Sequence, residues 1–176
     1  VSTMTGAGKG TKMEVADTVN FPHSLGHFYT VICQWLGFPK YGDEGKVMGL
    51  APYGEPRHMD KLAKVIRHYG KGQFELDLDY FATFADGNLM SWDGGTPTLP
   101  RMYSDHLIKL LGDPREPDSL LTDYHHDIAA SMQKTLEEIE MALVVELQRQ
   151  TGQTALCMAG GVALNSAFNG KILPKT

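Results

Sequence analysis

The sequence predicts an α/β protein, because helical and strand-like patterns alternate along one chain. Apolar residues recur at steps of three or four through residues 122–150, which indicates a long helix ended by Gly152. The unbroken apolar run at 154–159 is typical of a buried strand. Gly160 and Gly161 then form a turn that opens another helical stretch, so strand, turn and helix follow each other.

The first third of the chain predicts a hairpin followed by helices. Residues 1–19 form two extended segments with glycine turns between them, a hairpin that needs a further sheet because two strands alone are marginal. A helix should follow Pro22, with Ser24 as its cap and Gly37 just beyond its end. Its inner face would carry Leu25, Phe28, Ile32 and Trp35.

Shorter elements are expected between this helix and the long one. Residues 42–54 predict a short helix bracketed by glycines, and 57–69 another, with Met59, Leu62, Ala63 and Ile66 inward. Residues 70–120 look like an α+β insertion. It would hold strands at 74–78 and 89–92 and a helix at 102–111.

Composition excludes several classes of protein. The 176 residues carry a formal net charge of −5, which gives no basic footprint for nucleic acid, and no apolar run is long enough to span a membrane. We expect Cys33 and Cys157 to be buried, reduced thiols, which favours the cytoplasm. Residue 1 is Val and no signal peptide follows, so we expect the chain to begin inside a longer protein.

The Gly-Gly turn is the strongest local sign of chemistry. Glycines let backbone approach a ligand closely, and a helix N-terminus presents free N–H groups that suit phosphate or ribose oxygens. Asn165 would be able to hydrogen-bond a ribose or base. A tight strand-to-helix turn without a ligand explains the spacing equally well.

Other patterns in the sequence give weaker evidence for a binding site. Residues 6–11 miss the P-loop spacing, so a solvated turn is expected there. His23 and His27 are four apart on a helix and would share a metal only with further ligands, and a packing role is favoured. His125 and His126 point apart, in the first turn of the long helix. Glu44 would be able to accept from a ribose hydroxyl and Lys46 to neutralise a phosphate. The alternative is that both are ordinary charged residues of the surface.

Three stretches together resemble a known family. They are FPHSLGHFYT at 21–30 with LGF at 36–38, GDEGKVMGLAPYG at 42–54, and GGVALN at 160–165. The chain resembles the O-carbamoyltransferases of nodulation-factor and antibiotic biosynthesis. The resemblance covers both ends of the chain in the right order, whereas residues 56–120 carry little that is diagnostic.

The resemblance implies part of an actin-like, ribonuclease H-like duplicated ATPase domain. In this family carbamoyl phosphate and ATP give carbamoyl-adenylate, whose carbamoyl group passes to a hydroxyl of a small molecule. Iron or another divalent metal would polarise the carbamoyl carbonyl. By the same resemblance, the residues expected along the nucleotide are Gly160, Gly161, Asn165, Gly26, Thr30, Glu44 and Lys46, with residues 23–46 facing the turn across a shared cleft.

Departures from the family pattern limit this reading. The first phosphate motif, the family's histidine pair, its metal-binding Asp and the adenylate-forming domain are not found within the 176 residues. We therefore expect an incomplete nucleotide-binding domain at 1–176 that is inactive alone and holds no specific metal. Another actin-like-fold enzyme, such as a tRNA threonylcarbamoyl transferase or a sugar kinase, or a non-catalytic nucleotide-binding module, stays open. The acceptor is not readable from the sequence.

Overall fold

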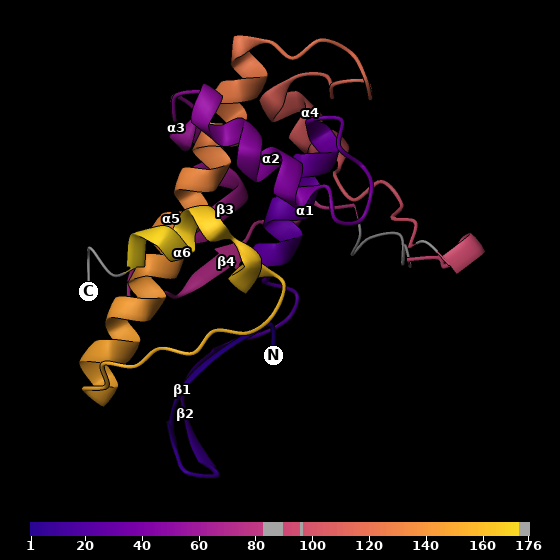
Figure 1. Cartoon of the computed structure of the whole chain (residues 1–176). Coiled ribbons are helices and arrows are strands. Elements are labelled where there is room, and N and C mark those ends of the chain that lie inside the picture. Colours follow the sequence, from indigo (N-terminus) through magenta and orange to yellow (C-terminus); the bar gives the residue numbers. More distant parts are fainter. Residues whose placement is uncertain (83–89, 96, 173–176) are drawn as a thin grey trace.

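A mixed α/β architecture is seen in the computed structural model, which describes residues 1–82, 90–95 and 97–172. The predicted hairpin is confirmed: β1 (Thr3–Lys9) pairs antiparallel with β2 (Lys12–Val19), and Gly10 turns between them at φ 61°. The turn of this hairpin projects away from the helices (Figure 1), while part of β1 lies beside α5. A second, separate two-stranded sheet joins β3 (Ile66–His68) to β4 (Phe74–Leu76).

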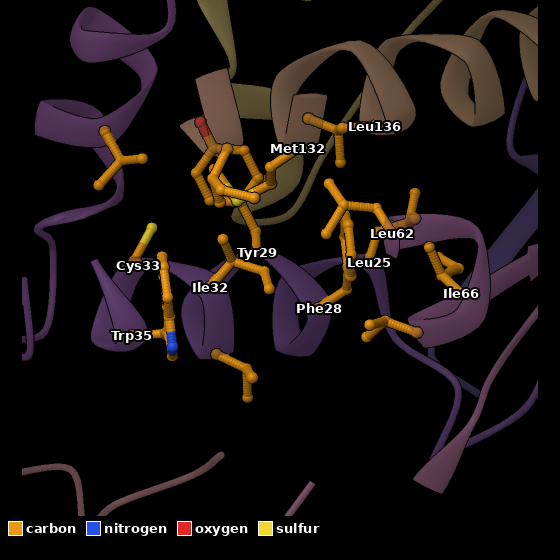
Figure 2. Packing of buried hydrophobic residues seen from close by; sticks show 14 of the residues in the cluster. Leu25, Phe28, Tyr29, Ile32, Cys33, Trp35, Leu62, Ile66, Met132 and Leu136 are labelled. Atoms are coloured by element: carbon orange, nitrogen blue, oxygen red, sulfur yellow. The ribbon is translucent and has the colours of Figure 1, made fainter. Parts of the chain in front are cut away.

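Helix α1 (Leu25–Trp35) lies at the centre of the core and confirms the predicted pattern. The Ser24 hydroxyl caps it by accepting from the His27 N–H at 3.3 Å. Gly37 follows the helix at φ 81°, a conformation that favours glycine. All four predicted inner residues, Leu25, Phe28, Ile32 and Trp35, are buried, and they meet Leu62, Ile66, Met132 and Leu136 from other elements (Figure 2).

The expected short helix at 42–54 is present as α2 (Glu44–Leu50), continued by the 3₁₀ turn η1 (Ala51–Tyr53). The helix expected over 57–69 is shorter, because α3 (Met59–Val65) gives way to strand β3. The β-branched Ile66 adopts extended backbone and pairs with Leu76, so sheet pairing overrides the helical pattern here. Ala63 was expected inward but is exposed, whereas Leu62 and Ile66 are buried.

The region expected as an insertion contributes β4, the 3₁₀ turns η2 (Leu78–Tyr80) and η3 (Asp93–Gly95), and helix α4 (Asp105–Leu111). The strand expected at 89–92 is reduced to one bridge between Ser91 and Thr98, and residue 89 lies outside the described residues. The described part of this region packs on α1. The Gln34 side-chain amide donates to the Pro100 carbonyl at 2.9 Å and accepts from the Met102 N–H at 2.8 Å. Such packing ties the region to the core.

The longest helix, α5 (Asp123–Thr151), matches the predicted bounds closely. Thr122 and His125 form a capping box at its start, and Gly152 ends it at φ 65°. Ile128, Met132, Leu136 and Ile139 are buried against α1, α2 and α3. Polar residues Gln133, Glu137 and Glu140 are also buried on this helix, a feature that the apolar pattern does not reveal.

The buried strand predicted at 154–159 is wrong. These residues have no regular secondary structure and are exposed, and Cys157, expected to be buried, is exposed with them. A strand needs a neighbour to satisfy its backbone groups, and in the described part of the chain both sheets consist of other segments. Beyond the Gly-Gly turn come the 3₁₀ turn η4 (Val162–Leu164) and helix α6 (Ser166–Ile172), as expected.

None of the helices that the structure describes combines the length and the apolar character needed to cross a membrane.

Candidate functional site

The two glycines of the Gly-Gly turn before α6 differ in backbone conformation. Gly160 adopts φ 102°, which L side chains rarely take, so its glycine is explained by the backbone. Gly161 has φ −59° and ψ −40°, an ordinary helical conformation. A Cβ built on Gly161 would meet nothing within 4 Å. Nothing in the described structure therefore requires glycine at 161, so the backbone and the packing around it do not explain this glycine.

The turn and α1 lie on the same side of the molecule. A Cβ built on Gly26 would be 3.7 Å from Cγ2 of Val162, the residue that follows the turn. The Ser166 hydroxyl, at the start of α6, lies 3.7 Å from the Met48 sulfur on α2. Figure 1 shows α6 beside α5, with the 153–161 segment leading into the short turn before α6. Segments more than 110 residues apart in sequence thus meet.

Thr30 and Glu44, two of the predicted residues, are joined directly. The Thr30 hydroxyl donates to Glu44 Oε1 at 2.7 Å, which links α1 to the first residue of α2. Lys46 points elsewhere: its ammonium lies 2.6 Å from the buried Asp43 carboxylate, and its side chain is 63% exposed. The structure therefore brings Glu44 to α1 and leaves Lys46 at the solvent edge of α2.

Asn165 is turned into the protein by contacts that the sequence did not predict. Its amide pairs reciprocally with the amide of Gln133 on α5, with both N···O distances 3.0 Å. The Tyr29 hydroxyl on α1 donates to the same Gln133 oxygen at 3.0 Å. Asn165 therefore joins the turn to two helices. In the sequence Gln133 and Glu137 stand next to apolar positions of α5, and the pattern gives no sign that they are buried.

Burial keeps the ionisable groups behind this site protonated. The pKa of Tyr29 is raised strongly, first by burial and then by nearby Cys33, Glu44 and Glu137. Burial also raises the pKa of the Cys33 thiol well above its usual value, helped by Glu44 and Asp43. Neither group supplies an anion near neutral pH, so Cys33 is a packing residue and Tyr29 a hydrogen-bond donor.

Two glutamates and a lysine lie close together where α5 meets α6. The Lys171 ammonium lies 2.7 Å from each oxygen of Glu137, and the pair flanks a groove of about 330 Å³ that Phe168 also lines. One turn along α5, burial and the Glu137 charge raise the pKa of Glu140 to about 8. Glu140 Oε2 has no hydrogen-bond partner among the residues described.

The histidines weighed as metal ligands have local roles. The His23 ring accepts from the Leu76 N–H at 3.1 Å, and burial lowers the pKa of His27. His125 Nδ1 accepts from the Thr122 N–H in the α5 capping box, which confirms its place in the first helical turn. Across residues 1–82, 90–95 and 97–172, no three His, Cys, Asp or Glu side chains are grouped so as to hold a metal.

Comparison with known proteins adds sequence relationships to this geometry. The family model described as Carbamoyltransferase N-terminus matches residues 3–176. The chain is 37% identical over 169 residues to the uncharacterized protein sll1178 of Synechocystis, covering 95% of this chain and 25% of that protein. It is 34% identical to the nodulation protein NolO of Bradyrhizobium diazoefficiens, covering 98% of this chain and 27% of NolO. For the nodulation protein NolNO of Sinorhizobium fredii the identity is 33%, over 94% of this chain and 21% of NolNO. The chain thus spans about a quarter of the length of these relatives.

Proposed function

Because the chain belongs to the carbamoyltransferase N-terminal family, we propose that it supplies part of the nucleotide site of an O-carbamoyltransferase. The donor is carbamoyl-adenylate, made from carbamoyl phosphate and ATP, and the acceptor is a hydroxyl of a small molecule such as a natural product or sugar. The carbamoyl–phosphate bond of the adenylate breaks, a carbamate C–O bond forms, AMP leaves, and the acceptor hydroxyl loses its proton. An actin-like domain, completed by further parts of the protein, is the fold we propose for this site.

The observation that carries the proposal is the meeting of the Gly-Gly turn with α1 and α2. Gly160 and Gly161 leave room for phosphate oxygens beside backbone N–H groups, and Gly26 lies next to the turn through Val162. Thr30 and Glu44 add a hydroxyl and a carboxylate on the α1 side, of the kind that bind ribose hydroxyls. We also assign Asn165 and Lys46 to this site. Asn165 holds the turn from within the protein, and Lys46 lies at the solvent edge, where its ammonium pairs with Asp43.

The metal that the resemblance implies does not fit the described residues, since they group no sufficient set of donors. We propose that its ligands belong to other parts of the protein. The cytoplasm is the compartment proposed, because both cysteines are free thiols.

Gly161→Val in the full-length protein tests the site. A Cβ at this position meets nothing within 4 Å and φ is −59°, so we expect the fold to accept the valine, which fills the place assigned to the nucleotide. We expect at least a tenfold loss in carbamoyl transfer from carbamoyl phosphate and ATP with unchanged thermal stability. Gly170→Ala is the matched control, because a Cβ there also meets nothing within 4 Å.

The same assay separates the alternatives. Phosphoryl transfer from ATP to a sugar without use of carbamoyl phosphate would identify a kinase. ATP binding without any turnover would identify a nucleotide-binding module. If Gly161→Val transfers carbamoyl groups as fast as wild type, the turn is not part of the nucleotide site.

A further inference from the structure

A fully satisfied glutamine connects the Gly-Gly turn to the helices behind it. Gln133 is 5% exposed, and its side-chain amide makes four hydrogen bonds. Its oxygen accepts from the Tyr29 hydroxyl and the Asn165 amide, each at 3.0 Å. Its nitrogen donates to Asn165 at 3.0 Å and to Glu137 at 2.9 Å. An amide side chain can donate two hydrogen bonds and accept two. Gln133 makes all four, so its orientation is fixed.

Asn165 links the fixed Gln133 side chain to the start of α6. Its Oδ1 also accepts from the Phe168 N–H at 2.9 Å, which caps the first turn of the helix. With the residue 8% exposed, its amide oxygen is held by Gln133 on one side and the helix start on the other. A rotation of Asn165 would leave buried donors and acceptors unpaired, which buried polar groups strongly disfavour.

The segment before Asn165 has little other support. Residues 152–161 are all exposed, and side-chain packing of the turn on α1 comes from Val162 beside Gly26. The inward amide of Asn165 is therefore the main polar tie between the turn and the helical core. In the proposed site a nucleotide bound at Gly160 and Gly161 also contacts α1. Its affinity therefore depends on the distance between the turn and α1, which the hydrogen bonds of Asn165 set.

We propose that Gln133 and Tyr29 are positioning residues of the nucleotide site, and that they act through Asn165 without touching the ligand. This inference rests on the proposed function, because it assumes a nucleotide at the Gly-Gly turn. It gives Asn165 the task of placing the turn, with its side chain directed away from the nucleotide.

The test is nucleotide affinity in the full-length protein, measured with a fluorescent ATP analogue. Gln133→Leu keeps the bulk but removes the amide, and should weaken binding at least tenfold. Tyr29→Phe removes one hydroxyl without changing the packing, and should weaken it about threefold. In an Asn165→Ala background neither change should add a further loss, because the path to the turn is already broken. Lys134→Gln, an exposed neighbour on α5, is the control and should leave affinity unchanged.

A pH profile separates positioning from a general loss of structure. In Gln133→Glu the new carboxyl lies near Glu137, which favours its protonated form, and Lys171 opposes this from the far side of Glu137. Protonated, it both donates and accepts, so affinity relative to wild type should recover as the pH falls from 8 to 6. Gln133→Leu has no titrating group and should show a constant ratio.

The outcomes distinguish this inference from the proposed function. If the wild-type protein fails to bind the ATP analogue, the proposed function falls and the inference with it. If wild type binds and Gly161→Val weakens binding, but Tyr29→Phe and Gln133→Leu bind as wild type does, only the positioning role is overturned. Additive losses in the Asn165→Ala background would also overturn it. If Gln133→Leu does not fold, Tyr29→Phe and Gln133→Glu still decide.

Discussion

Replacing Glu140 by Gln should remove a pH-dependent loss of stability. In the unfolded chain the pKa of this carboxyl is near 4.5, whereas in the folded protein burial and Glu137 raise it to about 8. Between these values the unfolded state has lost a proton that the folded state keeps, so the free energy of unfolding falls by about 1.4 kcal/mol per pH unit. At pH 7 the accumulated loss is about 3 kcal/mol, and it levels off above pH 8. Gln has no such titration and avoids this loss.

Urea unfolding from pH 4 to pH 9 measures the effect as the difference between wild type and Glu140→Gln. The difference in unfolding free energy should grow by about 3 kcal/mol between pH 4.5 and pH 7 in favour of the variant. Glu138→Gln, on an exposed carboxylate of the same helix, is the control and should follow the wild-type curve. Parallel curves for wild type and Glu140→Gln would refute the assignment of a buried, protonated carboxyl at 140.

Two further predictions concern packing and exposure. Gly54→Ala should cost at least about 2 kcal/mol, because its Cβ would lie 2.2 Å from the backbone carbonyl of His126 on α5. Gly49→Ala, in an open helical position of α2, should stabilise by about 1 kcal/mol, and equal unfolding midpoints for the two variants would contradict this packing. A thiol reagent should modify exposed Cys157 quickly and buried Cys33 only on unfolding, whereas equal rates would contradict the exposure of residues 154–159.

Helices were predictable where local signals agreed with burial. For α1, the Ser24 cap, the apolar spacing and Gly37 all gave the same bounds, and α5 was delimited equally well by its repeat and by Gly152. The pattern at 57–69 failed because pairing of Ile66 with Leu76 depends on a residue ten positions away. Local periodicity contains no information about such a partner.

The strand expected at 154–159 failed for a related reason. Its apolar residues meet the compositional requirement, but a strand also needs neighbouring backbone, and the described sheets are built from other segments. The family resemblance named the glycines, Thr30 and Glu44 as residues along the nucleotide, and that role stays a prediction. It did not indicate the hydrogen bond between Thr30 and Glu44, which depends on how α1 meets α2. The inward direction of Asn165 and the role of Gln133 were not predictable, because they depend on how α5 packs against α1 and α6.

Amide hydrogen exchange of the full-length protein, with and without ATP, tests the central claim most directly. We predict that ATP slows exchange both at residues 160–165 and at residues 25–30, because one nucleotide contacts the turn and the facing helix. Bound ATP that protects neither segment, or only one of them, would contradict a shared nucleotide site between the Gly-Gly turn and α1.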